Sequence, residues 1–156
     1  MFKITETEKG LRLSGLDRFS ISKIFDCGQC FRFDPSGGGI EGVAHGKVLR
    51  FEQPDSSTVN ITGINKSDFD SVFCRYLALD EDYEGVDSDI LTRLDNDQTI
   101  REAIKFGSGI RILRQDGWEA VCSFIISQNN NIPRIKKIVS RLCEMYGKPC
   151  TLGKET

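Results

Sequence analysis

The sequence predicts an α+β protein in which an N-terminal antiparallel sheet with flanking helices is followed by a helical segment. Between residues 3 and 65, short apolar and β-branched runs alternate with clusters of Gly, Pro, Asp and Ser, a spacing typical of antiparallel strands. In the last third of the chain, apolar residues instead recur at helical spacing. We therefore expect an N-terminal domain over residues 1–95 and a helical part over residues 96–156.

The strand candidates are residues 21–25, 30–33, 43–51 and 58–62. Their clearest hairpin connection is residues 35–39, because the three glycines there can take positive φ at little cost.

A helix is expected to follow, capped by Asn65 or Ser67, since both side chains accept hydrogen bonds from a first turn. Its apolar face contains Phe69, Val72, Phe73, Tyr76 and Leu77. Residues 80–97 then contain eight acids and one basic residue, Arg93. We interpret them as a solvated connector and helix surface.

Three more helices are predicted. Asp97 begins a short one that ends before Gly107, and Asp116 caps the next. The inner stripe of that second helix is expected to contain Trp118, Val121, Cys122 and Ile125.

The last helix begins near Ile132, with Pro133 tolerated in its first turn, and ends at Gly147. One side carries Ile135, Ile138, Val139, Leu142, Met145 and Tyr146, and the opposite side carries Arg134, Lys136, Lys137 and Arg141.

Composition indicates a soluble, unexported protein. The chain has 156 residues, 38% of them hydrophobic and 28% charged, and it contains neither a long apolar run nor a basic N-terminal leader. The net charge of −2 conceals a division: residues 1–100 hold 11 Lys and Arg against 18 Asp and Glu, whereas residues 101–149 hold 9 against 4. This asymmetry fits either a chance distribution of charge over solvated faces or a protein in which only the C-terminal third meets a polyanion.

The Cys27-Gly-Gln-Cys30 pair raises the alternative of a zinc or thiol redox protein. A structural zinc site needs four ligands, and the other four cysteines form no second close pair, while His45 is the only histidine. A thioredoxin-like site needs a helix that starts at the first cysteine, but residues 31–33 alternate like a strand. We therefore expect reduced thiols and no bound metal.

Four motifs in order carry a family resemblance. Residues 28–33 read GQCFRF, residues 76–80 read YLALD and residues 109–116 read GIRILRQD. Residues 123–132 then read SFIISQNNNI, with Arg134 just beyond. This series resembles the 8-oxoguanine DNA glycosylases of the helix-hairpin-helix superfamily. The resemblance implies a TATA-binding-protein-like N-terminal domain followed by the first helices of an all-α glycosylase domain.

The resemblance also implies roles for particular residues. Gly28 matches a glycine whose carbonyl recognises the lesion, with Gln29 and Phe31 as supporting scaffold. Asn129 matches the residue that enters the space left by the flipped base, Asn131 orders the loop beside Asn130, and Arg134 matches the arginine that binds the orphaned cytosine. These are roles that base flipping requires. The expected partner is double-stranded DNA with 8-oxoguanine opposite cytosine.

The family's nucleophilic lysine and later aspartate lie in a hairpin well beyond the triple asparagine, and no match precedes Thr156. We therefore expect no catalytic residue in this chain, not even Lys154, and expect residues 96–156 to be truncated opening helices with uncovered apolar faces. The implied enzyme is a DNA N-glycosylase and lyase of base excision repair. We expect it to be monomeric, without cofactor or membrane association, and cytoplasmic, at the nucleoid in a bacterium. The alternative is a non-catalytic damaged-DNA-binding or scaffold module.

Overall fold

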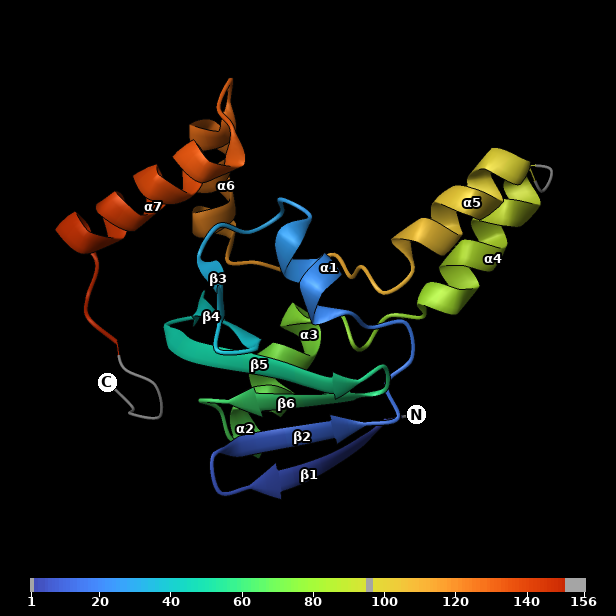
Figure 1. Cartoon of the computed structure of the whole chain (residues 1–156), viewed down its shortest axis with the longest axis horizontal. Coiled ribbons are helices and arrows are strands. Elements are labelled where there is room, and N and C mark those ends of the chain that lie inside the picture. The colour runs from blue at the N-terminus through green and yellow to red at the C-terminus, as the bar shows by residue number, and fades with distance from the viewer. Residues whose placement is uncertain (1, 95–96, 151–156) are drawn as a thin grey trace.

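A six-stranded antiparallel sheet forms the body of the protein (Figure 1). The sequence predicts an antiparallel sheet here, which is confirmed, but not the number of its strands. The computed structural model describes residues 2–94 and 97–150. The strand order is β1-β2-β6-β5-β4-β3. The strands are β1 (Lys3–Thr7), β2 (Gly10–Ser14), β3 (Phe33–Ser36), β4 (Gly39–Ala44), β5 (Lys47–Asp55) and β6 (Thr58–Thr62).

Three of the predicted strands are wrong in whole or in part. Residues 21–25 belong to a helix, α1 (Ile21–Asp26), because Ser20 caps its first turn by accepting from the Lys23 N–H. Of residues 30–33, only Phe33 lies in a strand. The predicted strand over residues 43–51 is instead parts of β4 and β5, which are joined by a tight turn.

Both turns of the β3–β4–β5 meander have positive φ at their two central residues. The predicted hairpin at residues 35–39 is confirmed, with Gly37 at 51° and Gly38 at 81°. His45 at 49° and Gly46 at 74° make the second turn. Two-residue turns of this hand match the twist of the strands that they connect.

The core lies on one face of the sheet. Leu11 pairs with Ile61, and Phe51 pairs with both Ile61 and Ile40, so their side chains share a face. The helix α1 adds Phe25, whose ring lies 4.9 Å from the ring of Phe51 and 4.4 Å from that of Phe33. Phe33 thus anchors the start of the outermost strand in the main core.

The predicted helix after residue 65 also covers this core. It runs without a break through α2 (Lys66–Asp68), a π-helical turn η1 (Phe69–Phe73) and α3 (Cys74–Tyr76). Asn65 is its N-cap, in a reciprocal capping box with Asp68. The predicted face is confirmed: Phe69, Phe73, Tyr76 and Leu77 are buried and Val72 is partly buried.

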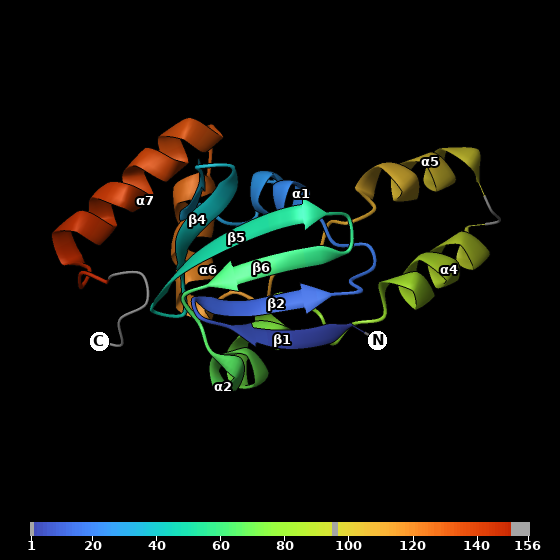
Figure 2. The ribbon, with the colours of Figure 1, turned by 60° about the horizontal axis from the view of Figure 1, so that its bottom comes forward.

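Two helical hairpins flank the sheet at opposite sides, as Figures 1 and 2 show. One consists of α4 (Tyr83–Arg93) and α5 (Gln98–Gly107), and the other of α6 (Gly117–Ser127) and α7 (Ile132–Tyr146). The predicted caps Asp97 and Asp116 are both confirmed. The domain boundary expected near residue 95 falls outside the described residues and stays a prediction.

The predicted inner stripe of α6 is wrong. Trp118 is 76% exposed and Val121 and Ile125 are also exposed. Cys122 alone of the predicted stripe is half-buried, and Ser123 is the buried residue of this helix. The reason is that α6 packs chiefly on α7 and leaves its other sides open. The expectation that these helices expose apolar faces is thereby confirmed. None of the helices in the described part of the chain combines the length and the apolar character needed to cross a membrane.

The burial of Phe51 generates a stability prediction. Phe51→Ala removes a fully buried ring and should lower the free energy of unfolding by about 3–5 kcal/mol, because the core cannot refill the space. The matched change Phe124→Ala, at a ring that is 67% exposed, should cost less than about 1 kcal/mol. Urea unfolding of both variants measures the difference, and equal losses would refute this placement of the core.

Candidate nucleic-acid interface

The structure brings together two motifs that are about a hundred residues apart in the sequence. Gly28 follows the end of α1 with φ of +80°, and a Cβ placed on it would lie 3.6 Å from Cδ1 of Ile132. Ile132 is the first residue of α7. Gly28 therefore lies beside the helix start that carries Asn131 and Arg134.

The asparagine loop divides its side chains between two uses. Asn130 donates to the Ile126 carbonyl at 2.7 Å, and Asn131 caps α7 by accepting from the Arg134 N–H at 3.0 Å. Asn129 takes a left-handed φ of 55°, which an asparagine tolerates better than most residues. The side chains of Asn129 and Arg134 are exposed. Two amides thus hold the loop, while one amide and one guanidinium project from it.

Gln29 fixes the chain next to Gly28. Its Nε2 donates to the carbonyls of Ile24 and Arg111, both at 2.9 Å, and its Oε1 accepts from the Leu113 N–H at 2.8 Å. The backbone carbonyl of Gln29 accepts from Nε2 of Gln115 at 2.6 Å. Every polar group of this side chain is therefore used to join the end of α1 to residues 111–115. Sequence reasoning missed Gln115, because its partner is 86 positions away.

Arg111 joins the same stretch, residues 111–115, to the segments that contain Asp17 and Ala78. It is only 8% exposed, and its guanidinium donates to the carbonyls of Ala78 at 2.7 Å and Asp17 at 3.2 Å. The guanidinium also stacks 4.5 Å from the ring centre of Tyr83. Burial lowers its pKa. Residue 111 lies within one of the four family motifs, but nothing local in the sequence shows that it bridges three segments.

Residues 31–34 attach the sheet to α7. Phe31, at 9% exposed, packs with Ile135 and Val139 in a second small core. Lys136 donates to the Phe33 carbonyl at 2.7 Å and pairs with Asp34 at 2.8 Å. The position of α7, and with it the asparagine loop, is therefore set by the strand that begins five residues after Gly28.

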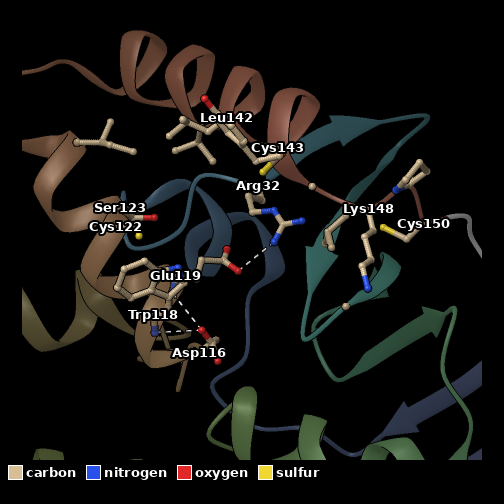
Figure 3. Close-up of a pocket in the computed structure, with 17 residues that line it drawn as sticks. Arg32, Asp116, Trp118, Glu119, Cys122, Ser123, Leu142, Cys143, Lys148 and Cys150 are labelled. Carbon is tan, nitrogen blue, oxygen red and sulfur yellow. Dashed lines mark hydrogen bonds and ion pairs between the residues drawn. The ribbon is translucent and has the colours of Figure 1, made fainter. Parts of the chain in front are cut away.

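A cavity of about 590 Å³ opens between α6, α7 and β4 (Figure 3). Trp118, Cys122, Leu142 and Tyr146 contribute to its lining. It is mostly apolar, with one ion pair of 3.0 Å between Arg32 and Glu119 at its wall. None of the predicted lesion or opposite-base residues lines it, so this cavity is distinct from the surface formed by Gly28 and the asparagine loop.

The two cysteines of the Cys27–Cys30 pair differ in environment. Cys27 is exposed at the end of α1 and donates to the Ile24 carbonyl, whereas Cys30 is buried. Burial raises the pKa of the Cys30 thiol to about 12, and the neighbouring Cys27 adds to this. Within residues 2–94 and 97–150, no three His, Cys, Asp or Glu side chains gather as a metal site would require. Lys154 lies outside the described residues.

The raised pKa predicts an unreactive thiol. At pH 8 roughly one Cys30 side chain in ten thousand is ionised with a pKa of about 12. Iodoacetamide should therefore modify the exposed Cys143 while Cys30 stays unmodified, as peptide mass spectrometry would measure. Both should react after unfolding in urea. Equal modification of the two in the folded protein would contradict the buried environment of Cys30.

The Gln29 network predicts a cost for removing one amide. Gln29→Leu keeps the approximate shape but leaves the Ile24 and Arg111 carbonyls and the Leu113 N–H without their partner. The free energy of unfolding should fall by about 1–3 kcal/mol. As the control, Gln98→Leu removes only an exposed hydrogen bond with Glu102 and should change it by less than about 0.5 kcal/mol. A destabilisation no greater than that of the control would show that the network is dispensable.

Solved structures resemble this chain along almost its whole length. MBOgg1 in complex with a low-affinity DNA ligand matches with a TM-score of 0.88 and 36% identity, over 97% of this chain and 51% of that one. The Clostridium acetobutylicum 8-oxoguanine glycosylase/lyase, in complex with double-stranded DNA containing cytosine opposite 8-oxoG, matches with a TM-score of 0.85 and 38% identity, over 94% of this chain and 49% of that one. The chain thus spans about half the length of these relatives.

Sequence comparison gives the same assignment. An N-glycosylase/DNA lyase of Saccharomyces cerevisiae is 51% identical over 43 residues, which are 28% of this chain and 11% of that protein. The family model for the N-terminal domain of 8-oxoguanine DNA glycosylase matches residues 11–121. This match covers well over half of the chain and includes three of the four motifs. The chain therefore belongs to the 8-oxoguanine DNA glycosylase family.

Proposed function

We propose that this chain supplies the lesion-recognition and opposite-base elements of an 8-oxoguanine DNA glycosylase that acts in base excision repair. The observation that carries the proposal is the proximity of Gly28 to the start of α7, 3.6 Å from a Cβ at residue 28 to Ile132. Recognition of the damaged base and recognition of the orphaned base must both occur at one opened base pair. Two motifs of the appropriate chemistry at one edge of the molecule satisfy that requirement.

Gly28 is proposed to read the lesion through its backbone carbonyl. Ordinary guanine has an acceptor at N7, whereas 8-oxoguanine carries a hydrogen there, so a carbonyl attracts the damaged base and repels the normal one. Within the described part of the chain, no residue donates a hydrogen bond to this carbonyl. The absence of a Cβ also permits a close approach between the backbone and the base. The bonds of Gln29 hold the next peptide in place during this contact.

Asn129 and Arg134 are proposed to read the other strand. A flipped nucleotide leaves a gap in the stack, and the Asn129 amide offers both donors and acceptors to the abandoned base edges. Arg134 presents a planar fork of donors to the acceptors of the orphaned cytosine. Asn131, by capping α7 at the Arg134 N–H, holds the backbone from which the Arg134 side chain projects.

Bond cleavage in the proposed reaction needs an amine that attacks the sugar carbon as the glycosidic bond breaks, forming a Schiff base that can permit strand cleavage. We assign this role to no residue of the chain. The proposed partner is duplex DNA with 8-oxoguanine opposite cytosine. The protein would therefore act in the compartment that contains the DNA. A cytoplasmic location, at the nucleoid in a bacterium, remains a prediction.

Arg134 provides the test. Arg134→Gln should reduce the preference for a duplex with cytosine, over adenine, opposite 8-oxoguanine by about 10- to 100-fold, because a bidentate base contact contributes about 1–3 kcal/mol of discrimination. Fluorescence anisotropy with labelled duplexes at fixed salt measures both affinities. Arg75→Gln removes an exposed arginine of α3 and should leave the ratio unchanged. A wild-type protein that binds both duplexes equally would refute the proposed role of this surface.

A further inference from the structure

We propose that Lys137 and Arg141, on the exposed side of α7, bind phosphates of the DNA strand opposite the lesion, next to the orphaned base that Arg134 meets. This side carries Arg134, Lys137 and Arg141, which we call the basic stripe. The inference rests on the proposed function, because Arg134 fixes which strand the stripe meets. The inference adds to base recognition the course that the DNA backbone takes along the protein surface.

Helix geometry places the three cations together. Residues 134, 137 and 141 are separated by three and four positions, so they share one side of α7. Ile135 and Val139 are buried and pack with Phe31, whereas all three members of the stripe are exposed. The packing of Phe31 against Ile135 therefore determines that the stripe faces away from the body of the protein.

The stripe is electrostatically unsatisfied. Across the residues that the structure describes, no hydrogen bond or ion pair engages the side chains of Arg134, Lys137 or Arg141. Many other cations are neutralised: Arg18 pairs with Asp87, Arg32 with Glu119, Lys47 with Asp68, Arg50 with Glu52, Arg114 with Asp80 and Lys136 with Asp34. On α7 itself, Glu144 accepts from Ser140 rather than from the stripe. The field of these three charges is therefore directed into solvent.

The length of the stripe suits a nucleic-acid backbone. Seven residues of helix separate Arg134 from Arg141, which is about 10 Å at about 1.5 Å per residue. Along the axis of a duplex, one DNA strand rises about 3.4 Å per phosphate, so a stripe that runs along this axis passes about three phosphates. With Arg134 at the orphaned base, Lys137 and Arg141 lie where the neighbouring phosphates of the same strand pass.

The charge on the opposite side of the protein favours an approach of DNA from the side of α7. Residues 80–97, which include the hairpin helix α4, hold eight acids and one basic residue and would repel a phosphate chain. That hairpin lies at the opposite side of the sheet from α7 (Figures 1 and 2). A duplex that reaches the asparagine loop thus meets cations along α7 and avoids the acidic side.

The salt dependence of binding tests the stripe separately from base recognition. The double variant Lys137→Gln/Arg141→Gln should make the plot of log Kd against log [KCl] less steep by about 1.8, or about 0.9 for each phosphate that the variant no longer neutralises. The ratio of affinities for cytosine and adenine opposite 8-oxoguanine should stay unchanged. The probe is a duplex with 8-oxoguanine opposite cytosine.

The matched control is Lys9→Gln/Lys105→Gln, which removes two exposed charges from the β1–β2 turn and from α5 and should leave the slope unaltered. Equal slopes for the two double variants would overturn the proposed phosphate binding even if the cytosine preference is intact. Wild-type protein that binds without a cytosine preference, but with the stripe-dependent slope, would refute the proposed function alone. No binding to any duplex would overturn both.

Discussion

The hydrogen bonds of Gln29 are the constraint on which the position of the interface depends. Residues 27–32 connect α1 to β3 without regular secondary structure, so their polar groups need partners from elsewhere. The Gln29 amide reaches Ile24 on one side and residues 111 and 113 on the other, while Gln115 binds the Gln29 carbonyl. One short segment is thereby tied to the stretch that leads directly into α6. Movement of either would displace Gly28 relative to the asparagine loop.

Residues 31–34 pack against α7 and thereby also determine where the cations of α7 lie. Phe31 and Phe33 are two residues apart but serve different cores, the first with α7 and the second with the sheet. Lys136 adds two bonds from α7 to the start of β3. Because one side of α7 is committed to these bonds, its other cations must face outward. The buried half of a helix thus determines which charges are free to meet a ligand.

Local signals in the sequence are sufficient for the caps, since Asn65, Asp97 and Asp116 act within their own turns. They indicate an antiparallel sheet but do not place most of its strands. They fail for residues 21–25, where an apolar run fits strand and helix equally and Ser20 decides the outcome. They also fail for α6, because periodicity identifies an apolar side without showing what covers it. The partners of Gln29 and Arg111 lie tens of residues away, and no local pattern encodes such bonds.

The division of charge between the two halves of the chain acquires a physical meaning in the structure. The acidic helix α4 and the basic stripe lie on hairpins at opposite sides of one sheet. Such a separation of charge would orient the DNA of the proposed function before any base is contacted.

A ¹H–¹⁵N NMR titration with two duplexes that differ only in 8-oxoguanine or guanine opposite one cytosine would show whether Gly28 and the asparagine loop meet DNA together. We predict lesion-dependent shifts at the amides of Gly28 and Gln29, together with shifts at residues 129–134, and none on α4. Shifts that centre on α4 or on β1, or identical Gly28 shifts with both duplexes, would contradict a shared recognition surface.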